Sequence, residues 1–299
     1  IRSCMYKVYK ITLIQFTQFL LIIFLVISSC KTPAPYTQEE AYQENVQYLK
    51  AQATDHWNKR LNGKKAVIAT FFLEKAHSHE PDNLELALLL CRAYHYEAYY
   101  IETDPAQKDS LYMMGARLAL QLIELSPAYQ NIITSAQDDS MLKVIEAITV
   151  VEKKYISAMY WWATNMGRYL SSKSVRVRLD HRELVEAVMH RVLSLDPEYF
   201  YSGPHRFFGA FYARLPGVEL SRSEEYFQKA IDTFPDYLGT YVLRAQFLHT
   251  KAGERKKFKA DLEFVINADP ARLPDLMPEN LFEQKKAQLL LNDEEMLFE

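Results

Sequence analysis

The sequence has few of the residues that mark several common classes of protein. It contains only 3 cysteines and 8 glycines among 299 residues, and its formal net charge is -3. So few glycines argue against a β-rich fold and against the glycine-rich loops that cradle phosphate groups. The near balance of charge leaves no electrostatic footprint for nucleic acid. We therefore predict no phosphate-binding loop and no nucleic-acid partner.

The cysteines cannot form an internal disulfide framework in the processed chain. Cys4 precedes Met5, which we expect to be the start of translation. Cys30 ends an apolar leader, and Cys91 stands alone within a helical pattern.

The leader has the features of a lipoprotein signal peptide. Lys7 and Lys10 precede a largely apolar run over residues 11–27, which is shorter than the roughly 20 residues of a spanning helix. The run ends in Ile27-Ser28-Ser29-Cys30, an aliphatic residue and two small ones before a cysteine. This is the lipobox pattern of bacterial lipoproteins, in which cleavage leaves an acylated cysteine at the new N-terminus. An ordinary signal peptide and an uncleaved anchor remain as alternatives.

We accordingly predict three parts: a lipoprotein signal peptide over 1–29, an acylated tether over 30–40 with the lipid on Cys30, and a helical domain over 41–299. Several acyl chains would hold the protein permanently on a membrane surface outside the cytoplasm. Lys31 stands where an aspartate would favour retention in the inner membrane, so we expect the outer membrane rather than the inner one.

The helical domain repeats one pattern, in which a helix runs up to a proline. The five prolines are Pro81, Pro127, Pro197, Pro235 and Pro270. Eight residues before them stand Leu73, Ala119, Met189, Phe227 and Leu262, and five residues before them stand Ala76, Leu122, Val192, Ala230 and Val265. The spacing of the last three prolines is close to the period of about 34 residues in tetratricopeptide repeats. One helix pair cannot bury such a stripe alone, so we predict stacked pairs in an all-α, tetratricopeptide-like superhelix.

Between these prolines, the apolar pattern predicts helices over 84–100 and 238–249, and helical spacing continues from Met141 to Met166. The interval between Pro81 and Pro127 is longer than the others. We place the extra residues in an inserted loop over 102–110, which contains Asp104-Pro105.

Signals for catalysis or metal binding are weak. His77 and His79 are two residues apart, so they point in different directions on a helix and cannot share a metal. The chain has neither a His-Glu-x-x-His nor a Gly-x-Ser-x-Gly motif. We predict no metal, no cofactor and no enzymatic activity. An enzyme would instead require His205, Arg206 and a carboxylate to converge on one cavity.

The stretch from Gly203 to Gly217 is the least explained by ordinary helix packing. Gly203-Pro204 is typical of a helix start, and Pro216-Gly217 of a helix end. His205, Gly209 and Ala213 share one face, where two small residues allow a close neighbour. One interpretation is a buried helix in close packing. The other is a wall facing a ligand channel or a partner, with His205 and Arg206 at its mouth and aromatic residues, including Phe208 and Tyr212, covering the rest.

A second unusual stretch contains adjacent tryptophans. Trp161 and Trp162 point about 100° apart on a helix, so at most one can face a given core seam. Asn165 lies four residues after Trp161, and a buried asparagine must find hydrogen-bond partners. The alternatives are interhelical packing, with Asn165 bonded to a neighbouring helix, and a wall of Trp161 and Asn165 that faces a ligand or partner.

Together these stretches resemble a known family. The motif Tyr160-Trp161-Trp162-Ala163-x-Asn165-x-Gly167, then residues 203–212 and Leu215-Pro216-Gly217, is similar to the T-component lipoproteins associated with TRAP transporters. The resemblance spans roughly Leu73 to Pro270. It departs from the family after Gly217, where Val218-Glu219-Leu220-Ser221 replaces further glycines.

The resemblance implies a helical, tetratricopeptide-like periplasmic lipoprotein with an apolar-lined channel, which forms homotrimers and docks the solute-binding protein of the transporter. Our leading hypothesis is such an accessory protein, with an apolar or organic-acid ligand in its channel. The ligand- or partner-binding residues would be Trp161, Trp162, Asn165, His205, Arg206, Phe208 and Tyr212. The alternative is a tetratricopeptide scaffold lipoprotein of envelope assembly, in which the aromatic stretches are core.

Overall fold

The computed structural model describes residues 37–135 and 141–299. The predicted signal peptide, Cys30 and most of the tether over 30–40 lie outside these ranges. The chain divides into two compact units, residues 1–47 and 48–299, and the larger unit contains every helix from α3 onward. Helix α2 begins at Gln38, within the predicted tether.

Throughout the described residues the secondary structure is helical, with no strand, which confirms the all-α prediction. The α-helices are α2 (Gln38–Asn58), α3 (Gly63–His79), α4 (Leu84–Tyr96), α5 (Pro105–Glu124), α6 (Pro127–Ser135), α7 (Met141–Thr149), α8 (Ile156–Ser171), α9 (Val175–Leu195), α10 (Tyr199–Arg214), α11 (Leu220–Thr233), α12 (Gly239–Leu243), α13 (Thr250–Ala252), α14 (Arg255–Asn267), α15 (Met277–Asn292) and α16 (Glu294–Leu297). Two π-helical segments, η1 (Glu97–Ile101) and η3 (Arg244–His249), continue α4 and α12. Short 3-10 turns are η2 (Lys153–Tyr155), η4 (Pro270–Arg272) and η5 (Pro274–Leu276).

The five prolines mark helix ends, as the sequence predicts: each lies just after the last residue of α3, α5, α9, α11 or α14. The apolar residues eight positions before them are all 0% exposed. The residues five positions before the prolines are buried as well. Each helix therefore contributes a buried stripe that its neighbours cover.

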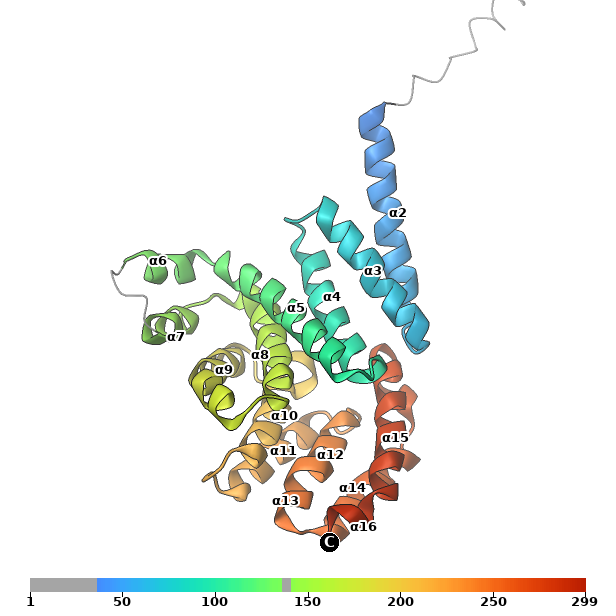
Figure 1. Cartoon of the computed structure of the whole chain (residues 1–299), viewed down its shortest axis with the longest axis vertical. Coiled ribbons are helices and arrows are strands. Elements are labelled where there is room, and N and C mark those ends of the chain that lie inside the picture. The colour runs from blue at the N-terminus through green and yellow to red at the C-terminus, as the bar shows by residue number, and fades with distance from the viewer. Residues whose placement is uncertain (1–36, 136–140) are drawn as a thin grey trace, which may run out of the picture. The chain divides into compact units, whose positions relative to one another are not determined.

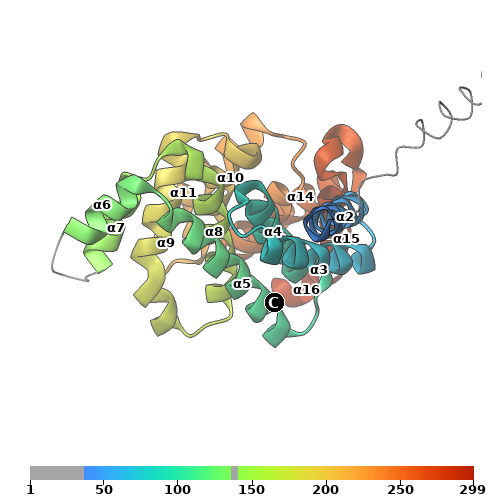
Figure 2. The ribbon, with the colours of Figure 1, turned by 90° about the horizontal axis from the view of Figure 1, so that it is seen from above.

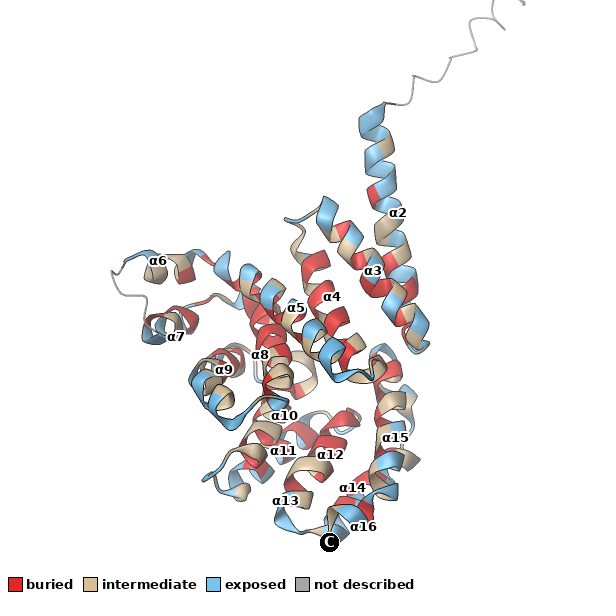
Figure 3. Cartoon of the chain, viewed as in Figure 1, coloured by how far each residue is buried: buried red, intermediate tan, exposed pale blue. Residues whose placement is uncertain are grey.

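Helix α8 lies in the middle of the larger unit, where it packs against α4, α5 and α9 (Figures 1 and 2). Buried residues follow α4 and α8, whereas α6 and α7 are more exposed (Figure 3). Helix α10 packs along α11, and α15 packs along α14.

Two expectations about the intervals between prolines need correction. The loop predicted over 102–110 is wrong, because helix α5 begins at Pro105 with Asp104 as its N-cap. Asp-Pro here starts a helix, since the Asp104 side chain accepts from the amide of Gln107 and proline suits the first helical position. The apolar series from Met141 to Met166 is divided between α7 and α8 by a non-helical connection and the turn η2.

Helix α10 ends where Pro216-Gly217 predict, but it begins at Tyr199, ahead of the start predicted at Gly203-Pro204. Phe200, Tyr201 and Ser202 have positive φ angles, and regular right-handed turns start at Gly203. The helix ends at Arg214, and Gly217 adopts a φ of 75°. A Cβ on Gly209 would lie 2.7 Å from the ring of Phe227 on α11, which confirms the close approach predicted for this face.

None of the helices within the described ranges is long and apolar enough to cross a bilayer.

Candidate functional site

A cavity of about 110 Å³ opens between α8 and α10. Further walls come from α4 with η1, from α12 with η3, and from α15. Its aromatic lining includes Tyr99, Tyr100, Tyr160, Trp161, Phe207 and Phe247. The cavity is thus formed by segments from both ends of the larger unit.

Regular helical spacing brings the lining residues of α8 and α10 to the cavity. On α8, Trp161, Thr164 and Arg168 follow one another at three and four residues, so they share one face. On α10, Gly203, Phe207, Ala210 and Arg214 form the corresponding face. A Cβ on Gly203 would lie 2.5 Å from the Tyr160 ring, so glycine there leaves room for that ring against the backbone of α10.

Both π-helical segments contribute to the cavity wall. Tyr99 and Tyr100 belong to η1, and Phe247 belongs to η3. A π-turn holds one more residue than an α-turn and re-aims the side chains that follow, and such turns occur frequently at functional sites. The sequence predicted these two segments only as continuations of ordinary helices.

Of the residues that we predicted to bind a ligand or partner, the structure brings Trp161 and Arg206 together on the cavity wall. Asn165 is fully buried behind the wall. Its Nδ2 donates to the carbonyl of Cys91 on α4, and its Oδ1 is 3.3 Å from Nδ1 of His95. Asn165 therefore makes interhelical bonds and orients His95, which does line the cavity.

The remaining predicted residues lie elsewhere. Trp162, Phe208 and Tyr212 are packed in the core, with exposed fractions of 4%, 0% and 0%. His205 is partly buried, its Nδ1 lies 3.2 Å from the Ser202 hydroxyl, and its ring contacts that of Tyr226. These four do not line the cavity, so any contact that they make with a ligand or partner stays a prediction.

Arg206 is buried and holds the backbone next to the cavity. Its guanidinium donates to the carbonyls of Tyr201 at 2.8 Å and Phe200 at 3.2 Å, and to the Tyr160 hydroxyl at 3.2 Å. The guanidinium carbon also lies 3.7 Å from the ring centroid of Tyr237. Arg206 thus connects the backbone of Phe200 and Tyr201, which have positive φ angles, to Tyr160 in the cavity wall.

Charged residues around the cavity carry an excess of positive charge. Four arginines line it, Arg92, Arg168, Arg206 and Arg214, against only Glu279 and Glu283. Both oxygens of Glu279 are used by arginines, one by Arg92 at 2.8 Å and one by Arg60 at 2.8 Å. Glu283 accepts from the Tyr100 hydroxyl at 2.9 Å.

Sequence reasoning did not single out Arg168 or Arg214 as site residues. A usable signal existed for Arg168, which lies seven residues after Trp161 and so on the same helical face. For Arg214 the matching signal is its position seven residues after Phe207.

Burial, followed by the charge of Arg168, lowers the pKa of His95 to about 3. His95 is therefore neutral near neutral pH, and the arginines supply the fixed charge of the wall. Across residues 37–135 and 141–299, no three histidine, cysteine or acidic residues are grouped to hold a metal. The arrangement can hold a small molecule by aromatic contact and by arginine hydrogen bonds.

A search of curated proteins found no match to this chain. The family model described as TRAP transporter T-component matches residues 66–298, which include every helix that lines the cavity. The chain therefore belongs to the TRAP transporter T-component family.

Proposed function

We propose that this protein is a lipid-anchored periplasmic accessory of a TRAP transporter, which docks the solute-binding protein and holds a ligand between α8 and α10. The observation that carries the proposal is the family match over 66–298 together with a cavity whose wall includes Trp161 and Arg206. Cys30 would carry the acyl anchor, in the outer rather than the inner membrane. The stacked helices would form a tetratricopeptide-like superhelix, and the protein would assemble as a homotrimer.

The cavity sets the size of the ligand. An engineered apolar cavity of about 150 Å³ takes up benzene. A volume of about 110 Å³ therefore suits a compact organic molecule with few heavy atoms. Aromatic rings around it would contact the body of such a ligand.

Docking is tested by capture from membranes. The Cys30-anchored protein, tagged and cross-linked in the envelope, should recover a solute-binding protein. An unrelated lipoprotein with the same tag serves as the control. Recovery of transporter components by the control as well would contradict specific docking.

The alternative is a scaffold of envelope assembly, and the complete burial of Phe208 and Tyr212 in the core favours it. In that case capture would recover only assembly machinery. Trp161→Ala would then lower stability without changing any ligand affinity.

A further inference from the structure

The guanidinium of Arg168 has no polar partner among residues 37–135 and 141–299. It lies over the ring of Tyr99, with its carbon 4.2 Å from the ring centroid. Within the described part of the chain it makes no side-chain hydrogen bond and no ion pair. Arg168 is half-buried and lines the cavity, so its donors are available to a ligand there.

Arg214 is similarly unsatisfied. Its Nε is buried without a hydrogen-bond partner among the described residues, and its guanidinium lies 5.1 Å from the ring centroid of Phe247. Burial, and then the charges of Arg168 and Arg178, lower the pKa of Arg214 to about 10. The side chain is therefore still cationic near neutral pH, although its charged neighbours are other cations.

The other charged side chains around the cavity make polar contacts, although Oε2 of Glu283 is buried without a hydrogen-bond partner among the described residues. Arg92 is paired with Glu279, and Arg206 donates to backbone carbonyls and to Tyr160. Glu283 is near enough to Arg168 to interact electrostatically, but it is not within ion-pair distance and it accepts from Tyr100 instead. Within the part of the chain that the structure describes, Arg168 and Arg214 are thus the two cations at the cavity whose side-chain donors have no hydrogen-bond or ion-pair partner.

Burying a cation without a partner is costly, and stability alone gives no reason to keep one. Strain and unpaired charge are typical of sites that are completed by a ligand. Here two such arginines come from facing helices, α8 and α10, and both line one cavity. An anion placed between them would relieve their mutual repulsion and satisfy their donors.

A second, smaller cavity of about 60 Å³ shares Gly167, Phe211 and Arg214 with the first. Its other walls include Leu170, Val185 and Leu215. Arg178 and Arg182 line this second cavity too, and the rest of its lining is mostly apolar. Arg214 therefore lies between the aromatic cavity and this one, which fits a molecule with one charged group and an apolar body.

We propose that Arg168 and Arg214 bind the carboxylate of a small organic acid, whose apolar body lies against the aromatic wall of the cavity. The inference rests on the ligand cavity of the proposed function. Of the two ligand classes in the leading hypothesis, apolar and acidic, it selects the acidic one. Arginine suits this role because its planar fork matches a carboxylate and donates two parallel hydrogen bonds.

The test compares benzoate with benzamide, which has nearly the same shape and no charge. The full chain is purified in a non-ionic detergent and titrated calorimetrically with each probe. Benzoate should bind about 10- to 100-fold more tightly, the range expected for hydrogen bonds to a charged group. Arg168→Gln and Arg214→Gln should each lose that preference and still bind benzamide as the wild type does. Arg176→Gln, an exposed arginine outside the cavity, is the matched control and should keep the preference.

The stability of the ligand-free variants separates a binding role from a structural one. Arg168→Gln and Arg214→Gln should unfold at a temperature equal to or higher than the wild type, because each removes a half-buried charge without a partner among the described residues. A clear loss of stability in both variants would make these arginines structural and would overturn the proposal.

Other outcomes also contradict the proposal. Equal affinities for benzoate and benzamide would overturn the carboxylate site and leave the ligand cavity standing. Binding of inorganic phosphate as tightly as benzoate would show that the site binds any small anion, and would overturn the proposal that its ligand is an organic acid. If neither organic probe binds, both the carboxylate site and the ligand cavity fail, whereas docking of a solute-binding protein is judged separately by the membrane capture.

Discussion

Three consecutive residues, Phe200, Tyr201 and Ser202, adopt backbone angles that residues with a side chain avoid. The left-handed conformation costs roughly 1–2 kcal/mol for each such residue. Arg206 offsets this cost, because its guanidinium donates hydrogen bonds to the carbonyls of Phe200 and Tyr201. This left-handed segment places the ring of Phe200 against the ring of Trp161, at a centroid distance of 5.0 Å.

We predict that Arg206→Lys destabilises the protein by about 2–4 kcal/mol, because an ammonium cannot reach both carbonyls and Tyr160 in the same way. The free energy of unfolding in urea measures the change. Arg176→Lys, which alters an exposed arginine, should stay within about 0.5 kcal/mol of the wild type. An Arg206→Lys protein as stable as that control would show that the left-handed turn does not depend on the guanidinium.

His95 gives a prediction for pH. Its pKa is lowered to about 3 in the folded protein, against about 6.5 in an unfolded chain. Between these two pH values the unfolded state binds more protons than the folded state does. The free energy of unfolding therefore falls as the pH is lowered from about 6.5 toward 3. One such group contributes up to about 1.4 kcal/mol for each pH unit.

His95→Gln should therefore make the unfolding free energy less dependent on pH within that window. The slope, measured by urea unfolding between pH 4 and pH 6, is compared with the wild type. A lower stability at every pH with an unchanged slope would mean that the histidine already carries a proton in the folded protein.

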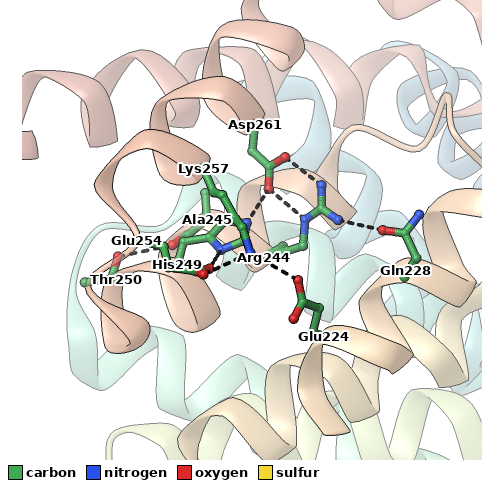
Figure 4. A network of polar contacts seen from close by, with 9 residues as sticks. All are labelled: Glu224, Gln228, Arg244, Ala245, His249, Thr250, Glu254, Lys257 and Asp261. Atoms are coloured by element: carbon green, nitrogen blue, oxygen red, sulfur yellow. Dashed lines mark hydrogen bonds and ion pairs between the residues drawn. The ribbon is translucent and has the colours of Figure 1, made fainter. Parts of the chain in front are cut away.

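Among the elements, η3 and α14 are joined by a network of charges (Figure 4). Arg244 donates to both oxygens of Asp261, at 2.8 and 2.7 Å, and Nε2 of His249 lies 3.2 Å from Asp261. Nδ1 of His249 lies 3.1 Å from Glu254. Burial alone would raise the pKa of Asp261, but the hydrogen bonds from Arg244 and His249 hold it below its usual value. The network fixes the π-helical segment that carries Phe247 to the cavity.

Asp261→Asn should lower the free energy of unfolding by about 3–5 kcal/mol, because Arg244 and His249 would lose their shared anion in a buried position. Glu224→Gln is the matched control in the same network, since Glu224 is exposed and, among the residues that the structure describes, pairs only with Lys257 at 3.4 Å. It should change stability by less than about 1 kcal/mol. Equal losses in the two variants would contradict the distinction between the buried and the exposed pair.

Much of the element pattern could be predicted from the sequence, because the signals are local. The prolines and the apolar residues before them give the helix ends and the buried faces. The helix start at Asp104-Pro105 was missed because the same dipeptide also occurs in turns, and only the flanking structure distinguishes the two. The π-segments could not be predicted, since their extra residue leaves the apolar pattern nearly helical and depends on packing against other elements.

For the whole larger unit, the candidate site depends on contacts between segments that are far apart in the chain. The sequence predicted, as one of two interpretations of each stretch, that Trp161 lies on a wall facing a ligand or partner and that His205 and Arg206 lie at the mouth of a channel. It could not show that His205 turns toward Tyr226, since that depends on where α11 lies. Nor could it show that Arg168 has no hydrogen-bond partner among the described residues, because that depends on where the neighbouring helices place their side chains.

Glu279 connects the two ends of this unit. Its carboxylate accepts hydrogen bonds from Arg60, 219 residues away in the chain, and from Arg92, 187 residues away. The Glu279 side chain is 7% exposed. Glu279→Gln would leave two arginines without their carboxylate, so we predict a loss of about 3–5 kcal/mol in the free energy of unfolding. Glu80→Gln, which breaks the more exposed pair with Lys50, should cost less than about 1 kcal/mol.

The same variant should have the opposite effect on the proposed ligand. Removing the carboxylate of Glu279 frees Arg92 at the cavity wall and increases its positive charge, so benzoate should bind more tightly while the fold becomes weaker. Calorimetric titration and urea unfolding of one preparation measure both effects. A parallel fall in affinity and stability would show that the Glu279 contacts shape the cavity more than they set its charge, and would count against an electrostatic basis for acid binding.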